Sequence, residues 1–161
     1  MAGTNIVACK RALIASLAAI ADTPGSALAG DPAGRVMPVK VSYHYPGEAP
    51  RRKLIYGGRA VGEQDQAAMR GGGRVPRLEQ AVITLHIEVS RPGADPIAAE
   101  QDAEEIAAIV VELLADDPQL QQQTGLLFAG IASTELEPAA VDDDGVYADL
   151  ALGLRVQSFL R

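Results

Sequence analysis

Between residues 77 and 89 the chain alternates apolar and polar side chains, in the sequence RLEQAVITLHIEV. A period of two predicts a long strand with one buried face. That buried face is expected to carry Ala81, Ile83, Leu85, Ile87 and Val89. After a short Arg-Pro-Gly turn, residues 95–114 change to helical spacing and become rich in acids. A strand that leads directly into an acidic amphipathic helix is therefore the clearest unit of the sequence.

The same two periods predict the other elements. Apolar residues recur at helical spacing after Thr4, a good N-cap, which predicts a helix over residues 4–21. Pro38 stands early in one predicted strand and indicates a sheet edge or the start of a strand. Gly57 and Gly58 indicate a bulge in the next strand. The four further strands are expected at residues 36–45, 53–61 and 126–136, and from Val146 onward after a turn at 142–145.

The elements follow one another in the order αβββαββ, without the β-α-β alternation of a parallel fold. This order predicts an α+β fold, with an antiparallel sheet of four or five strands and two helices packed on one face. Residues 62–76 are polar and rich in glycine, which predicts a flexible loop. The 161 residues are expected to form a single domain (1–161).

Composition excludes some classes of protein. The formal net charge is −7, which argues against tight binding to a phosphate backbone, because such affinity comes from Lys and Arg. Cys9 is the only cysteine, so neither a disulfide within the chain nor a cysteine-based zinc site can form. We expect Cys9 to be a small buried side chain of the first helix.

The first helix also has the outline of a secretory signal. Lys10 and Arg11 precede the apolar run ALIASLAAIA, and small residues at 27–29 resemble a cleavage site. The helical spacing of the apolar residues favours an amphipathic helix of the domain instead. The apolar run is also shorter than the roughly 20 residues that cross a bilayer.

Candidate chemistry is sparse. His86 lies beside Thr84 and Glu88 on the polar face of its strand, where a His/Glu pair could act as an acid/base couple, or simply form a polar surface or subunit contact. The DDDG sequence at 142–145 starts like a calcium loop but lacks the later ligands, and a hairpin turn explains it equally well. The glycines at 71–73 lack the context of a phosphate-binding loop. The sequence thus predicts no catalytic residue, cofactor site or metal site.

Basic and acidic residues are separated along the chain. The acids gather in the second helix and in the turn near residue 142. Unlike patches on one subunit favour head-to-tail association, which closes into a ring where the rotation allows it. The alternative is ordinary solvated charge. The basic stretch contains Arg51, Arg52, Lys53, Arg59, Arg70, Arg74 and Arg77.

Several segments together resemble the tail terminator (tail completion) proteins of long-tailed phages, in the form found in phages of actinobacteria. They are the opening helix KRALIASLAAIAD, the strands VKVSYHYPGE and KLIYGGRA, and the basic, glycine-rich loop. The strand–turn–helix unit from residue 77 to 120 follows, and VYADLALGLRVQSFL closes the sequence. The resemblance covers almost the whole chain, and it is carried by the order of the elements rather than by any chemical signature.

The resemblance implies a virion protein at the head-proximal end of the tail, assembled in the host cytoplasm. Six copies would form a ring that caps the tail tube, stops its polymerisation and docks the head–tail connector. DNA would pass through the ring without specific binding. Its partners would be itself, the tail tube protein and the connector or head-completion protein. The residues expected at subunit or tube contacts are Arg51, Arg52, Arg59, Arg70, Arg74, Arg77, His86 and Glu88.

Two other functions remain open from the sequence. A head-completion protein, which forms a connector ring in the phage neck, can also be a small α+β subunit. A small enzyme or ligand-binding domain could use Thr84, His86 and Glu88. A deep pocket around those residues would favour this second alternative, whereas a flat sheet face covered by a neighbouring subunit would count against it.

Overall fold

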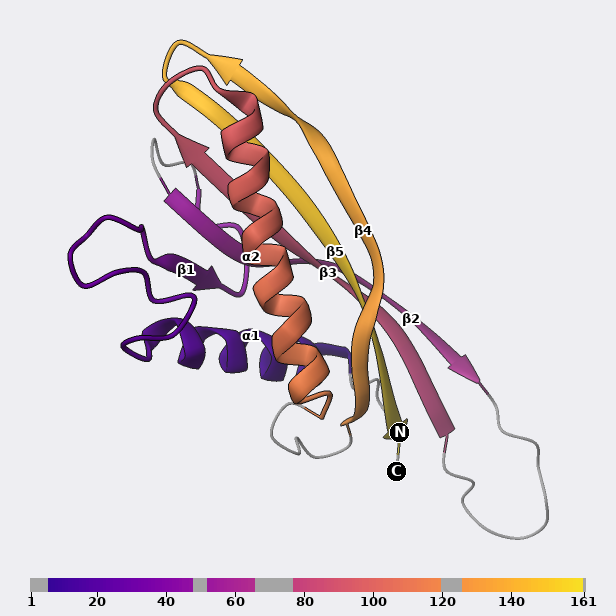
Figure 1. Cartoon of the computed structure of the whole chain (residues 1–161). Helices are drawn as coiled ribbons and strands as arrows, with labels where there is room; N and C mark the ends of the chain where they lie inside the picture. The colour runs from indigo at the N-terminus through magenta and orange to yellow at the C-terminus, as the bar shows by residue number, and fades with distance from the viewer. Residues whose placement is uncertain (1–5, 48–51, 66–76, 120–125, 161) are drawn as a thin grey trace, which may run out of the picture.

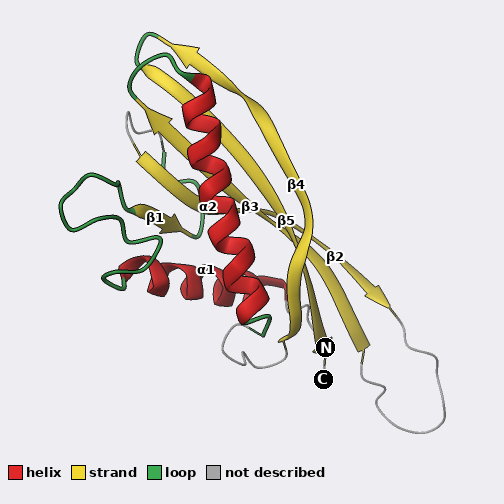
Figure 2. Cartoon of the chain, in the orientation of Figure 1, coloured by secondary structure: helices red, strands yellow, loops and turns green. Residues whose placement is uncertain are grey.

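The computed structural model describes residues 6–47, 52–65, 77–119 and 126–160. In these described residues, two helices and five strands make up an α+β fold (Figures 1 and 2). The strands that begin at Arg52 and Leu126 end at Asp65 and Asp142, beyond the ends near residues 61 and 136 that the hydrophobic pattern predicts. In chain order the elements are α1 (Ile6–Asp22), β1 (Val39–Ser42), β2 (Arg52–Asp65), β3 (Arg77–Arg91), α2 (Pro96–Asp116), β4 (Leu126–Asp142) and β5 (Gly145–Leu160).

The five strands form one sheet, in the spatial order β1-β2-β3-β5-β4, which differs from their order along the chain. The expectation of a purely antiparallel sheet is wrong, because β1 pairs in parallel with β2 and the sheet is mixed. Parallel neighbours usually need a long crossover. Here β1 has only four residues, and it pairs with the first part of β2. The position of β1 at the sheet edge agrees with Pro38 just before it.

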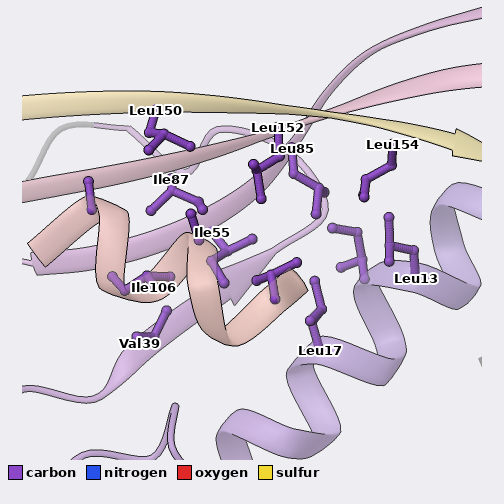
Figure 3. Close-up of a cluster of buried hydrophobic side chains, with 14 of the residues drawn as sticks. Leu13, Leu17, Val39, Ile55, Leu85, Ile87, Ile106, Leu150, Leu152 and Leu154 are labelled. Carbon is purple, nitrogen blue, oxygen red and sulfur yellow. The ribbon is translucent and has the colours of Figure 1, made fainter. Parts of the chain in front are cut away.

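Both helices cover the same face of the sheet, which is strongly twisted (Figure 1). The core lies between that face and the helices, and it joins Leu13 and Leu17 of α1 to Ile106 of α2 (Figure 3). Alternation along β3 supplies the middle of this core, because its five expected apolar residues are all at most 3% exposed. Cys9 is also buried, as expected for a small side chain of the first helix. Desolvation by burial and the negative charge of Glu79 raise the pKa of its thiol, outweighing a hydrogen bond with Ser158.

Strands β2 and β3 form a longer hairpin than their apolar residues indicate. Residues 62–65 belong to β2, where Asp65 is the partner of Leu78, so the loop begins later than expected. Backbone pairing with β3 explains this, because a strand can continue through polar residues while its ladder is satisfied. The expected bulge is present between Gly57 and Ala60. The rest of the predicted loop, residues 66–76, lies outside the described part of the chain.

Aspartate side chains fix the start of α2 and the turn between β4 and β5. The Asp95 carboxylate accepts hydrogen bonds from the backbone N–H groups of Ile97 and Ala98, at 3.1 and 3.3 Å, and caps α2. The Asp142 carboxylate accepts from the backbone N–H groups of Asp144 and Gly145, both at 2.9 Å. The DDDG sequence is therefore the hairpin turn between β4 and β5. Gly145 has a φ of +148°, and an added Cβ would lie 2.3 Å from the Arg91 carbonyl oxygen, so this position requires glycine.

Candidate functional site

The sheet face opposite the helices carries a cluster of polar and aromatic side chains, here called the open-face network. Its members come from four segments that are distant in sequence but adjacent in the sheet. The segment after β1 folds back over this face, so that its tyrosine meets residues of β2. The network consists of Tyr45 from the segment after β1, Arg52 and Tyr56 from β2, His86 and Glu88 from β3, and Asp149 from β5.

Arg52 and Glu88 form the strongest contact in the network. The Arg52 Nη2 and Nε atoms both donate to Glu88 Oε1, at 2.7 and 3.1 Å. The two side chains are only 11% and 15% exposed. Arg52 also donates to the Gly47 carbonyl oxygen, and its guanidinium lies 5.3 Å from the centre of the Tyr45 ring. Burial alone would lower the pKa of Arg52, but its bonds to Glu88 and Tyr45 raise it above the ordinary value, so the cation is firmly held.

His86 is held between an acid and an aromatic ring. Its Nδ1 atom lies 3.2 Å from Asp149 Oδ1, and its ring stacks on Tyr56 at 4.9 Å between centroids. A Cβ added to Gly58 would lie 2.6 Å from the imidazole, so glycine there leaves room for the ring. The Tyr56 ring also meets Tyr45, at 5.2 Å and an interplanar angle of 60°. These contacts fix the orientation of the imidazole on the sheet.

The Tyr56 phenol should ionise well above the ordinary pKa of a tyrosine. Burial and the nearby carboxylates of Asp149 and Glu88 raise its pKa from 10.0 to about 12, although the Arg52 charge opposes the shift. The folded state favours the neutral phenol, so this contribution to stability is complete below pH 10 and is lost as the pH rises toward 12. Ultraviolet difference titration of the protein and of Tyr56→Phe should show the late-ionising phenol only in the unaltered chain. The absence from the unaltered chain of a phenol that titrates near pH 12 would contradict this prediction.

A cavity of about 370 Å³ borders one end of the open-face network. Glu88 and Asp149 line it together with Tyr45, and Glu137 and Tyr147 complete the wall that β4 and β5 provide. Carboxylates beside aromatic rings form a surface suited to cations, such as the ammonium or guanidinium group of a partner. Within the described residues, no group of three or more His, Cys, Asp or Glu side chains is arranged to hold a metal ion.

The structure places the expected contact residues in different surroundings. His86 and Glu88 come together on the open face, while Arg59 is exposed on β2. Arg52 already binds Glu88 of its own chain. Arg77 belongs to β3, where its backbone pairs opposite Leu160. The side chain of Arg77, and the residues Arg51, Arg70 and Arg74, lie outside the described part, so their contacts stay predictions.

Sequence reasoning missed the partners that surround His86. Asp149 lies in a strand far along the chain, and only the β3–β5 register, with Glu88 opposite Asp149, brings it to this face. Thr84, which the sequence groups with His86, does not line the cavity. The sequence contains one useful signal, because Asp149 is a polar residue that alternates with apolar residues along β5. Alternation alone does not give the register, so it does not show which residues of β3 lie beside Asp149.

No protein-family model matches the chain, and a search of curated proteins finds no match. In the described residues, neither helix has the length and apolar character needed to cross a membrane.

Proposed function

We propose that this chain is a structural virion protein, a tail terminator that caps the tail tube of a long-tailed phage as a ring of six copies. The resemblance in element order supports the proposal, and one structural observation carries it. The described helices cover one face of the sheet only, and the other face leaves several large apolar side chains exposed. Tyr45, Val61 and Phe128 are 43%, 47% and 47% exposed, and Val61 and Phe128 lie in strands of this sheet.

The open-face network suits a surface that another protein covers. The bonds between Arg52 and Glu88, and between His86 and Asp149, satisfy charged groups within the subunit. Charges that are already paired lose less on desolvation than unpaired ones, so such a face can be buried against a partner. We assign this face to contact with a neighbouring subunit, the tube or the head connector.

Termination requires two unlike faces on the ring. One face must match the last ring of the tube, and the opposite face must reject a further tube ring while it accepts the head connector. The surface that lines the channel would be acidic, in keeping with the net charge of −7, so that DNA passes without being held. No catalytic step and no cofactor belong to this role.

Electron microscopy of particles from a phage with a nonsense codon in this gene tests the proposal. Overlong tail tubes beside unattached, filled heads are expected, because nothing would stop polymerisation of the tube. Normal-length free tails beside heads that leak DNA would overturn the terminator role and indicate head completion. Intact, infectious particles would exclude both structural roles.

The cavity beside Glu88 and Asp149 supports a second function, the binding of a small cationic ligand. A volume of about 370 Å³ falls within the range of small-molecule sites. His86 and Thr84 do not line this cavity, so it does not assemble the acid/base group that the sequence suggested. Isothermal titration with simple amines tests it: binding that is lost in Glu137→Gln, an exposed residue that lines the cavity, would support this function, and no binding to the unaltered protein would overturn it.

A further inference from the structure

The charged residues of α2 and of β4 are all acidic, with Glu135 and Glu137 on the open face of the sheet. Neither element contains a lysine or an arginine. Strand β4 is also the last strand of the sheet, and it brings its acids to this edge. The acids of the two elements are Glu100, Asp102, Glu104, Glu105, Glu112, Asp116, Glu135, Glu137 and Asp142.

An apolar groove of about 500 Å³ runs between α2 and β4. Its floor includes Leu150 of β5, and its sides include Val111 of α2 and Leu136 of β4. Val111 and Leu136 are 40% and 45% exposed, although both lie beside the core. Glu104 and Glu112 stand among the residues that line the groove. The result is an apolar depression with carboxylates at its margin, the usual composition of an interface core and rim.

The other edge of the sheet has the opposite charge. Elements α1, β1 and β2 contain six basic residues and three acids, Asp22, Glu63 and Asp65. Arg11, Lys40 and Arg59 are exposed there, as are Val7 and Val61, at 59% and 47%. The basic residues of this edge are Lys10, Arg11, Lys40, Arg52, Lys53 and Arg59.

We infer that the groove between α2 and β4 is one half of a subunit interface, and that it receives the α1–β2 edge of a second copy of this chain. The inference rests on the proposed ring and specifies its contact surfaces. The two edges lie at opposite ends of one sheet, so they cannot meet within a subunit, but they complement each other between subunits. A contact between unlike surfaces is heterologous, and its repetition closes a ring when the rotation allows it.

Side chains, rather than a continuous strand ladder, make this contact. Strand β4 has register shifts at three places in its pairing with β5, and Pro138 lacks a backbone donor. Bulges and proline at an edge discourage pairing with another strand. Lys10 occupies a backbone acceptor on the corresponding part of β2, because its Nζ donates to the Gly58 carbonyl oxygen at 2.9 Å. The apolar groove supplies the area of the contact, and the charges set its register and partner.

Sedimentation velocity of the full chain at low and high salt tests the inference. The unaltered protein is expected to self-associate, more strongly at low salt because the contact is partly electrostatic. Glu104→Lys should weaken association by about tenfold or more. Glu105→Lys is the matched control: the same charge change on the next residue of α2, which does not line the groove, should alter association by less than about twofold.

A mixing experiment separates this surface from a general effect of charge. Arg11→Glu combined with Arg59→Glu should also weaken association, because it reverses the basic edge. An equimolar mixture of this double variant with Glu104→Lys should associate again. In a ring in which the two variants alternate, each reversed edge meets a reversed groove, and each unaltered edge meets an unaltered groove. Circular dichroism must show each variant folded, which we expect because all three residues are exposed.

Three results would overturn the inference: a monomeric unaltered protein at low salt and high concentration, equal effects of Glu104→Lys and Glu105→Lys, or a mixture that does not associate. None of these would by itself overturn the terminator role, which the nonsense phage tests. A monomer in solution together with overlong tails would remove this interface and leave the function standing. Normal tails from the nonsense phage together with a salt-sensitive oligomer would do the reverse.

Discussion

Replacement of Leu85 by alanine is expected to lower the free energy of unfolding by about 3 kcal/mol. Leu85 is 0% exposed at the centre of β3, between Gly57 of β2 and Leu152 of β5 (Figure 3). Strands hold it on both sides and a helix layer covers it, so the structure cannot collapse into the space left by the lost methyl groups. A domain of this size has a stability of roughly 5–15 kcal/mol, so the loss is a large fraction of the total.

Leu136→Ala is the matched control for this prediction. It removes the same atoms from another strand, but Leu136 is 45% exposed at the groove, so the cost should stay below about 1 kcal/mol. Urea unfolding followed by circular dichroism measures both variants under conditions that keep the protein monomeric. Equal losses for the two leucines would show that the middle of β3 is not the tightly packed centre of the core.

Glu88→Ala is expected to cost about 2–3 kcal/mol, because it leaves the Arg52 guanidinium poorly hydrated and without its carboxylate. The Arg52 side chain is only 11% exposed and donates two hydrogen bonds to Glu88, so water cannot fully replace the lost partner. The remaining bond to the Gly47 carbonyl and the Tyr45 ring retain part of the stabilisation. This places the expected cost somewhat below that of breaking a fully buried pair.

The double variant Arg52→Met with Glu88→Leu distinguishes the net contribution of the ion pair to stability from the cost of leaving one charged partner unpaired. Replacing both groups by apolar side chains should recover most of the stability, because the charge left by Glu88→Ala is removed with it. Glu137→Ala is the control, since this glutamate is exposed on β4 and should cost less than about 0.5 kcal/mol. Chemical unfolding of all three variants is the measurement. A double variant less stable than Glu88→Ala would contradict this account of the Arg52–Glu88 contact.

Local patterns predicted the elements whose burial is uniform along their length. Alternation in β3 identifies both of its faces, because core side chains lie on one side of the strand over residues 79–89. The helical spacing and Asp95 locate α2 in the same way. The length of β2 and β4 was underestimated because their ends are polar or exposed, so pairing with a neighbour, and not burial, maintains them as strands.

Pairings between distant segments could not be read from local patterns. The parallel contact of β1 with β2 depends on a short edge strand whose partner is chosen by the packing of α1 and β1 onto the sheet. The open-face network depends on register: His86 meets Asp149 only because β5 inserts between β3 and β4. The groove between α2 and β4 depends on how far one helix covers a twisted sheet. The sequence does separate basic from acidic residues. In the folded sheet this separation gives the two edges opposite charge.

The place of β5 in the sheet has a consequence for synthesis of the protein. Residues 145–160 form an interior strand, with β3 on one side and β4 on the other. Until those residues have left the ribosome, the nascent chain holds a β1-β2-β3 half and a separate β4 that have no common strand. Both would expose unpaired edges and apolar side chains, which favour aggregation. The final assembly of the sheet is therefore a late event. A truncated transcript that ends before the codon for residue 145 should produce a chain that chaperones bind and proteases degrade, rather than a partly active subunit.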